Sequence, residues 1–416
     1  MALLHLPVAY DAVVGEEFAL YYRGLLNCIE PSYFDVELSF SDGVSRGSSY
    51  RRKYVFTPAK GDVGEHRLTL TVRDVYGKVA EVGHTLLRVH ACPHPQKGDR
   101  VILCVGDSLT YPGIWPNALA TRLADAGVKG MRLVGSCLRE EEGEARFEGY
   151  GGWTFASYTT DFRSPRFMFI YGDFSDKTEA LDQHSFWEDA LGTVWKLESV
   201  TASCAKLIHE RGGRELPPAG RLVHVSGGTS HADLVYTRAE QADANPFYSD
   251  TRGGLDFRAY AAAQGASHID EVLVLLGANS TEEREESYKA QVRAFLDPLL
   301  RDFPDCRVTL AGCGVPDRDG MGHNYGIAWH AAEKGEFIRR LCRWHTEVAA
   351  DYEGLVQAID LAGQFDTDYH YPSTEMRANP YVERTERVGT NALHPTRKGQ
   401  EQIADIFYRH LCGHLK

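Results

Sequence analysis

Two kinds of apolar pattern divide the chain. Within residues 1–93, apolar and polar side chains alternate, and a period of two predicts strands with one buried face. The alternating apolar positions are Phe34, Val36, Leu38 and Phe40 and, further along, Leu68, Leu70 and Val72. From residue 101 onward the apolar residues gather in short runs without regular alternation, which is typical of strands buried on both faces of a parallel sheet. These runs lie at 101–105, 131–134, 272–276, 308–311 and 355–359.

Helical periodicity separates the continuous runs. Apolar residues recur there every three or four positions, which predicts helices with one buried face. They are Tyr288, Val292, Phe295, Leu299 and Phe303; Phe337, Leu341, Trp344 and Val348; and Ile403, Ile406 and Phe407. Thr396 precedes the last group and is a candidate N-cap. Alternating strands and helices predict an α/β fold, a three-layer α/β/α sandwich with a parallel sheet.

Turn signals and prolines indicate the domain organisation. Gly- and Asp-containing turns between the strands of residues 1–93 predict a small all-β sandwich. Residues 94–100 are the expected linker, and residues 101–416 the α/β domain. A stretch rich in Gly, Ser and Thr at about 165–246 interrupts the α/β rhythm. We expect it to be a β-rich insertion that serves as a lid or substrate wall.

Composition narrows the class of protein. Of the 416 residues, 43% are hydrophobic and 25% charged, as in soluble globular proteins. The formal net charge of −13 argues against a nucleic-acid partner, because such proteins present a basic face. No apolar run reaches the ~18 residues of a membrane helix, and the N-terminal segment lacks a basic region before its apolar residues. We therefore expect no membrane span and a cytoplasmic location.

The nine cysteines do not form a recognisable framework. Their number is odd and no CxxC pair occurs, so we expect reduced thiols rather than disulfides or a zinc site. No metalloprotease, calcium-loop or nucleotide-binding motif is present either. The sequence therefore predicts neither a metal nor an organic cofactor.

Ser108 is the first candidate for chemistry. It follows the first continuous apolar run, in "VILCVGDSL". In doubly wound sheets, ligands bind at the carboxyl ends of the strands, where a helix also begins. A serine there exposes its hydroxyl and can direct its N–H toward a developing oxyanion. The alternative is that Ser108 only caps the following helix.

Four separated segments together resemble the SGNH hydrolases, also called GDSL esterases and lipases. They are "GDSL" at 106–109, "FEGYGGWT" at 147–154, "VLLGANS" at 274–280 and "NALHP" at 391–395, in the order of the family. The resemblance implies a flavodoxin-like α/β fold and a serine esterase that forms an acyl-enzyme. Residues 54–82 similarly resemble the back half of bacterial immunoglobulin-like modules.

The resemblance assigns a role to each block. Ser108 would be the nucleophile and His394 its base, since a serine hydroxyl needs an adjacent base and a neutral imidazole can take its proton. The oxyanion would be held by the N–H groups of Ser108 and Gly149 and by the side-chain amide of Asn279. In the second block, the alignment favours Gly149 over Gly151.

Two positions depart from the family pattern. Asn391 stands where an aspartate usually orients the histidine, and it supplies no charge. We expect a weaker triad, a Ser–His dyad, or an acid from elsewhere. Asp107 is a poor substitute, because its side chain should point away from Ser108. Ser280 replaces the usual aspartate after Asn279, at a position that we interpret as structural.

Several further residues are candidates for substrate contact. Trp153 could stack on a sugar ring, with a buried tryptophan as the alternative. Asp107 and Gly151 flank the predicted site in sequence. His323 and Tyr325 lie in a Gly-rich segment after the run at 308–311, on the side of the sheet where the site is expected.

The sequence therefore predicts a serine esterase of the SGNH type. Its expected substrates are small acyl esters, foremost O-acetyl groups on a carbohydrate. One alternative is a lipase, lysophospholipase or thioesterase of the same fold. Another is a glycan-binding or structural protein with weak catalysis, which Asn391 favours. The all-β domain would bind glycans or act as a spacer that packs on the catalytic domain, and the oligomeric state stays open.

Overall fold

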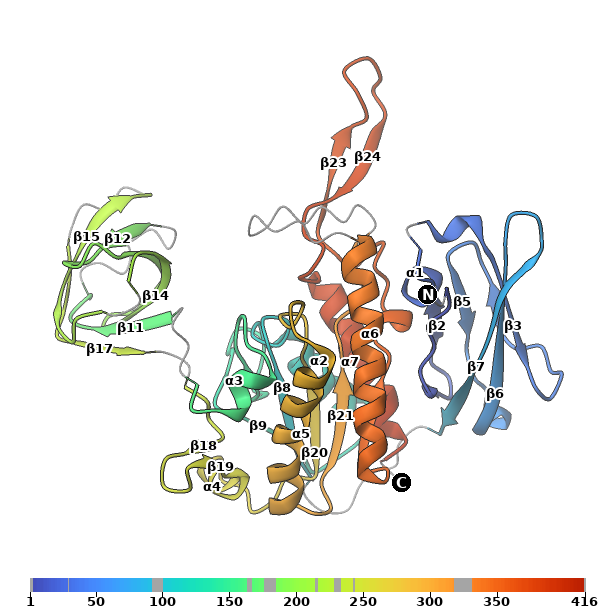
Figure 1. Cartoon of the computed structure of the whole chain (residues 1–416), viewed down its shortest axis with the longest axis horizontal. Coiled ribbons are helices and arrows are strands. Elements are labelled where there is room, and N and C mark those ends of the chain that lie inside the picture. The colour runs from blue at the N-terminus through green and yellow to red at the C-terminus, as the bar shows by residue number, and fades with distance from the viewer. Residues whose placement is uncertain are drawn as a thin grey trace. The chain divides into compact units, whose positions relative to one another are not determined.

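The computed structural model describes residues 3–28, 30–91, 100–162, 167–175, 185–213, 216–227, 233–241, 244–317 and 331–414. By its contacts the chain divides into two compact units. One comprises Met1–Phe155 with Leu255–Lys416, and the other Ala156–Gly254. The described part has a mixed α/β architecture with several sheets and seven α-helices (Figure 1).

Residues 3–91 of the first unit, which we refer to as the N-terminal β domain, contain two sheets around one core, and their being a separate domain stays a prediction. The four-stranded sheet has the order β1-β7-β6-β3, and the three-stranded sheet the order β2-β5-β4. Their bounds are β1 Ala9–Val13, β2 Phe18–Tyr21, β3 Asp35–Phe40, β4 Ser48–Ser49, β5 Lys53–Phe56, β6 Gly64–Arg73 and β7 Val79–His90. Both sheets bury side chains in the same hydrophobic cluster, among them Phe18, Phe56 and Leu70. The alternating strands predicted here are confirmed as β3 and β6, whereas the immunoglobulin-like topology stays a prediction.

The α/β domain is built on a six-stranded parallel sheet. Its order is β10-β8-β20-β21-β22, and β9 pairs with β8 beside β10. The bounds are β8 Arg100–Gly106, β9 Met131–Val134, β10 Glu148–Gly149, β20 Glu271–Leu275, β21 Arg307–Ala311 and β22 Val356–Ile359. All five continuous apolar runs are thereby confirmed as strands. Their lack of alternation has a simple cause, because central strands such as β8 and β20 are buried on both faces.

Three of the described helices, α5, α6 and α7, lie where amphipathic segments were predicted. Their bounds are α1 Tyr22–Leu25, α2 Ile114–Asp125, α3 Phe155–Thr159, α4 Phe257–Ala263, α5 Glu285–Asp302, α6 Ala331–Ala349 and α7 Arg397–Cys412. Helix α2 packs against α7, and α5 packs against α6. Thr396 is confirmed as the N-cap of α7, since its side chain accepts the N–H of Gly399. The three-layer arrangement stays a prediction.

Shorter elements complete the first unit. Strands β23 Ser373–Arg377 and β24 Thr385–Gly389, which come between β22 and α7 in the chain, form an antiparallel hairpin that projects at the top of the view (Figure 1). Single 3-10 turns occur at Pro31–Tyr33, Lys60–Asp62, Ala350–Tyr352 and Ala362–Gln364. The expected linker lies almost entirely outside the described residues.

The second unit is β-rich and has a core of its own. Its seven-stranded antiparallel sheet has the order β16-β15-β12-β13-β14-β11-β17. The bounds are β11 Phe167–Tyr171, β12 Phe186–Glu188, β13 Val194–Val200, β14 Cys204–Arg211, β15 Gly220–Ser226, β16 Leu234–Tyr236 and β17 Arg238–Gln241, with a separate pair β18 Tyr248–Ser249 and β19 Gly254–Leu255. Trp187, Trp195 and Leu207 are fully buried in its core. The role of this unit as a lid or wall stays a prediction.

Buried polar contacts join the N-terminal β domain to the α/β domain within the first unit. The Tyr10 hydroxyl donates to Asp360 Oδ2 at 2.9 Å. Asp11 lies between two imidazoles, with Oδ1 2.6 Å from His90 Nε2 and Oδ2 2.7 Å from His410 Nδ1. Burial raises the pKa of Asp11, but His410 and His90 outweigh this effect and hold that pKa well below its usual range. The first domain therefore packs on the second through polar groups removed from water.

Two further sequence expectations concern the whole chain. The eight cysteines that the structure describes are free thiols, five of them buried, as expected for reduced cysteines. Among the helices described, none has the length and apolar content needed to cross a membrane.

Candidate active site

Ser108 lies at the carboxyl end of the sheet, two residues after the end of strand β8. The strand ends at Gly106, where a Cβ would lie 2.0 Å from Thr110 Oγ1, so only glycine fits. A turn follows, closed by N–H donation from Thr110 and Tyr111 to the carbonyl of Asp107. Helix α2 begins only at Ile114, and its N-cap is Gly113 at a φ of 75°. The idea that Ser108 caps this helix is therefore wrong, because five residues of turn separate the serine from the helix.

Asp107 organises this turn from inside the protein. Its side chain is fully buried, and Oδ1 accepts the N–H of Leu109 at 3.0 Å. Burial raises the pKa of Asp107 to about 7. A carboxyl with no exposed surface does not contact a substrate from solvent, so the prediction of Asp107 as a substrate-binding residue is wrong.

His394 meets Ser108 across the sheet edge. The two residues are 286 positions apart, yet His394 Nε2 lies 2.9 Å from Ser108 Oγ. Both side chains are half-buried. Burial lowers the pKa of His394, so the imidazole is neutral at neutral pH. A neutral imidazole within hydrogen-bond distance of a serine hydroxyl is the arrangement that general-base activation requires.

Asn391 is oriented by the backbone of its own turn. Its Oδ1 accepts the N–H groups of Leu393 at 3.0 Å and His394 at 2.9 Å. These two donors fix which end of the amide is oxygen. The Nδ2 group is consequently the end that faces His394 Nδ1, at 3.4 Å. Asn391 therefore presents a donor to the imidazole, where an aspartate would present an acceptor.

The second block lies beside the first. In β10, Gly149 pairs with Gly106 of β8, and the N–H of Tyr150 donates to the Gly106 carbonyl at 3.2 Å. A Cβ on Gly149 would lie 2.8 Å from the backbone of Thr110 and Tyr111. Glycine is thus required at 149 by its close approach to the turn that carries Ser108. Gly151 lies in the next turn, which the Trp153 N–H closes on the Tyr150 carbonyl.

Glu148 holds the second block in place, a role that sequence reasoning missed. It is fully buried and accepts hydrogen bonds from the Tyr150 hydroxyl at 2.7 Å, the Tyr260 hydroxyl at 2.6 Å and the Ser136 N–H at 2.6 Å. Burial raises the pKa of Glu148. The available signal was a lone acid inside the otherwise uncharged "FEGYGGW". A buried acid of this kind needs partners, and tyrosine hydroxyls are suitable ones.

Asn279 follows strand β20 and is exposed at the same edge. The turn needs Gly277, whose φ is 119° and whose Cβ would lie 2.4 Å from Leu341. The Asn279 amide Nδ2 donates to Asp107 Oδ2 at 3.2 Å and to the Trp153 carbonyl at 3.1 Å. Both of its protons therefore have protein acceptors, and binding an oxyanion requires that one of them be shared or redirected. Ser280 is buried, at 1% exposure.

The remaining residues predicted to contact substrate are either buried or lie outside the described residues. Trp153 is 1% exposed and stacks on Tyr150 with ring centroids 4.2 Å apart. It is therefore the buried tryptophan of the two alternatives, and its ring does not offer a face to a sugar. His323 and Tyr325 lie outside the described residues. The contacts given above link five of the candidate residues, namely Ser108, His394, Asn391, Gly149 and Asn279.

Among the described residues, one group of side chains has the donor types of a metal site. His5, Cys342 and Asp360 place ligand atoms within 4.8 Å of one another. Asp360 is already engaged by the Tyr10 hydroxyl and by the N–H of Gly363. Burial raises the pKa of Cys342 well above its usual range, which disfavours the thiolate that binds metals. The prediction of no metal cofactor stays a prediction.

Comparison with known proteins adds a list of distant structural similarities. No family model and no curated protein matches the chain. Similar solved structures include the family 3 carbohydrate esterase of Clostridium thermocellum, at 13% identity and a TM-score of 0.38, over 77% of this chain and 98% of that chain. They also include the native aryl esterase of M. smegmatis, at 14% identity and a TM-score of 0.34, over 75% of this chain and 98% of that chain. At such TM-scores these similarities carry no argument about function.

Proposed function

We propose that the protein is a serine esterase that cleaves small acyl esters, foremost O-acetyl groups on carbohydrates, through an acyl-enzyme. The observation that carries this proposal is the 2.9 Å contact between Ser108 Oγ and His394 Nε2. The contact lies at the carboxyl end of a parallel sheet, where such folds bind ligands. Its two residues come from the first and last of the four blocks that resemble the SGNH hydrolases.

The reaction would proceed in two balanced steps. Ser108 Oγ attacks the ester carbonyl while its proton passes to His394 Nε2, and the carbonyl oxygen becomes the oxyanion. Collapse expels the alcohol, which takes the proton from His394. Water then attacks the acyl-enzyme while its proton passes to His394, and collapse releases the carboxylic acid as His394 returns that proton to Ser108 Oγ. Donors for the oxyanion would be the N–H groups of Ser108 and Gly149 and the amide of Asn279.

Hydrolysis of p-nitrophenyl acetate tests the nucleophile. We expect Ser108→Ala and His394→Ala each to lower kcat by about 1,000-fold or more. Ser287→Ala is the matched control, because Ser287 is exposed on α5. The proposal fails if Ser108→Ala keeps the wild-type rate.

The pH profile tests the base. A base must be unprotonated, so the rate falls as the pH drops through its pKa. Because burial lowers the pKa of His394, we expect the acid limb of kcat/KM to have its midpoint below 6.5. A limb centred near 7 that disappears in Asp107→Asn would instead belong to the buried carboxyl.

Substrate class needs a separate measurement. Rates on p-nitrophenyl esters of increasing acyl length distinguish an acetylesterase from a lipase or thioesterase. We expect the acetate ester to be preferred, and a preference for eight carbons or more would contradict the acetylesterase assignment. Release of acetate from O-acetylated xylan, set against deacetylated xylan, then tests the carbohydrate.

One observation favours a second candidate, a protein with only weak catalysis. The Asn391 amide presents its Nδ2 to His394 Nδ1. A donor there favours the tautomer with the proton on Nε2, which cannot accept the serine proton. If kcat of the wild type stays within about 10-fold of Ser108→Ala, this second candidate is the better description.

A further inference from the structure

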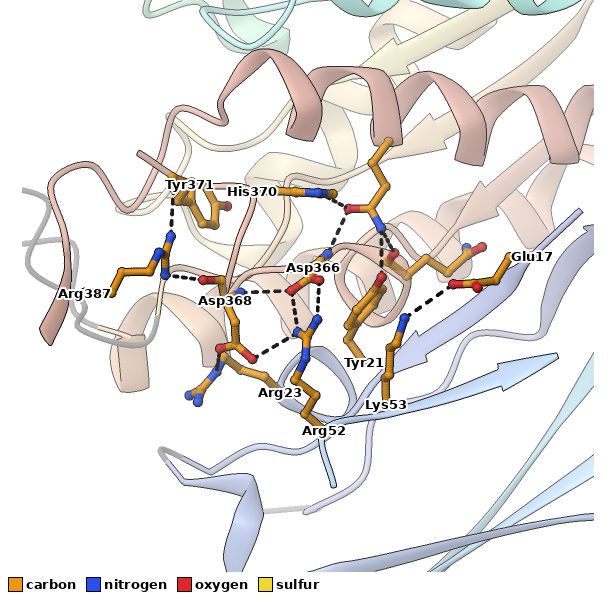
Figure 2. A network of polar contacts seen from close by, with 12 residues as sticks. Glu17, Tyr21, Arg23, Arg52, Lys53, Asp366, Asp368, His370, Tyr371 and Arg387 are labelled. Carbon is orange, nitrogen blue, oxygen red and sulfur yellow. Dashed lines mark hydrogen bonds and ion pairs between the residues drawn. The ribbon is translucent and has the colours of Figure 1, made fainter. Parts of the chain in front are cut away.

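Arg52 of the N-terminal β domain contacts a loop of the α/β domain at residues 365–371 (Figure 2). Its guanidinium donates two hydrogen bonds of 2.7 Å to Asp366, one to each carboxylate oxygen. Arg52 Nη1 also lies 3.4 Å from Asp368 Oδ2, while Arg23 Nε donates to Asp368 Oδ1 at 2.9 Å. A bidentate pair fixes orientation as well as distance. The first domain thus holds this loop in a defined position.

The loop is held from its other side by α7. Gln402 Oε1 accepts the N–H of Asp366 at 2.9 Å and lies 2.6 Å from His370 Nδ1 (Figure 2). Within the loop, the Asp366 carbonyl accepts the N–H of His370 at 3.0 Å. The main chain at Asp366 and at His370 is therefore fixed by the same set of contacts.

His370 touches the segment that carries the catalytic histidine. Its carbonyl accepts both the N–H of Thr396, at 2.8 Å, and the Thr396 hydroxyl, at 3.1 Å. Thr396 is the N-cap of α7 and follows His394 by two residues. A Cβ on Gly399 would lie 2.7 Å from the same carbonyl, so the first turn of α7 packs directly on it. The position of the loop consequently limits where His394 can lie.

We propose that Arg52 is a positioning residue for His394, acting from the N-terminal β domain through Asp366, the 365–371 loop and Thr396. This inference rests on the proposed esterase function and extends it. Proton transfer from Ser108 depends on the 2.9 Å contact with His394, and small displacements of reacting groups reduce rates steeply. The N-terminal β domain therefore helps to hold Ser108 and His394 at hydrogen-bond distance.

Removal of Arg52 leaves the two domains joined. Arg339 of α6 donates to the carbonyls of Arg23, at 2.8 Å, and Leu26, at 2.6 Å. The Tyr10–Asp360 hydrogen bond is also independent of Arg52. A variant at Arg52 therefore changes the loop contact without detaching the domain.

The test compares Arg52→Ala and Arg52→Lys with Arg122→Ala in the full chain. Arg122 is a matched control, because it also bridges the two domains, donating to Glu16 Oε2 at 2.6 Å, and its side chain is 36% exposed like that of Arg52. We expect Arg52→Ala to lower kcat on p-nitrophenyl acetate by about 10-fold with KM unchanged. Arg52→Lys keeps the charge but not the bidentate geometry, so its kcat should lie between that of the wild type and that of Arg52→Ala.

The pH profile separates positioning from a general loss of stability. If His394 moves toward solvent in Arg52→Ala, its desolvation decreases and the acid limb of kcat/KM shifts upward toward 6.5. Arg122→Ala should keep the wild-type kcat and the wild-type midpoint of the acid limb. The inference is overturned if Arg52→Ala and Arg122→Ala have the same kcat and the same midpoint of the acid limb. It is also overturned if the loss of kcat in Arg52→Ala is fully explained by a lower Tm. An inactive wild type would instead overturn the proposed function, and the inference with it.

Discussion

Replacing Asn391 by aspartate should increase the esterase activity that we propose. The two side chains have the same shape, and an aspartate oxygen can still accept the N–H groups of Leu393 and His394. The other carboxylate oxygen would take the place of Nδ2, 3.4 Å from His394 Nδ1. It would accept an Nδ1–H and leave Nε2 free to take the proton of Ser108. The variant thus changes the donor at this contact into a charged acceptor.

The size of the gain follows from the interaction that is created. A hydrogen bond to a charged group contributes about 1.5–3 kcal/mol. Here that energy is realised chiefly when the imidazole becomes cationic, which is in the transition state. Because about 1.4 kcal/mol corresponds to a factor of ten in rate, we expect kcat/KM to rise by about 10- to 100-fold in Asn391→Asp.

The assay is hydrolysis of p-nitrophenyl acetate near pH 8, with Asn379→Asp as the matched control. Asn379 lies in the turn of the β23–β24 hairpin, where its Oδ1 accepts the N–H of Tyr381, and its replacement adds the same charge without contacting His394. The control should keep the wild-type rate. The reasoning is refuted if Asn391→Asp folds with an unchanged Tm and is no faster than the wild type, because Nδ1 would then already have an adequate acceptor.

Three further changes test the scaffold of the site. Glu148→Ala leaves two buried tyrosine hydroxyls without their acceptor, so we expect a loss of about 2–4 kcal/mol in the free energy of unfolding by urea. Gly149→Ala places a methyl group 2.8 Å from the backbone of Thr110, so we expect kcat to fall by about 10-fold or more. An unchanged kcat would show that the turn after Ser108 can shift to accommodate the methyl group. Asp11→Asn removes a carboxylate of lowered pKa, whose stabilisation is fully present above the unfolded pKa of ~3.9 and is lost progressively as the pH falls from there toward the much lower folded pKa. The wild type should therefore be more stable than Asp11→Asn by about 2–3 kcal/mol at pH 6, and thermal unfolding should show this difference shrinking steadily below about pH 4.

Much of the fold could be predicted from local pattern. The apolar runs became the strands of the parallel sheet, and central strands such as β8 and β20 are buried on both faces, which favours apolar residues at successive positions. The cap of α7 was also readable, since Thr396 satisfies a helix N–H within its own turn. Local pattern failed at the start of α2, where the turn after Ser108 closes on Asp107 and packs against Gly149 of the second block, so that the helix begins only at Ile114.

The sequence alone determined which residue types stand in which order, and hence that Ser108 and His394 were candidates for one site. Only the tertiary structure decided their distance, the burial of Trp153 and Asp107, and the direction of the Asn391 amide. The link from Arg52 to the histidine segment was likewise invisible in the sequence. The distance and the burial depend on groups far apart in the chain, which meet only when the chain folds. The direction of the amide depends on the backbone conformation of its own turn, which the residue types alone do not specify.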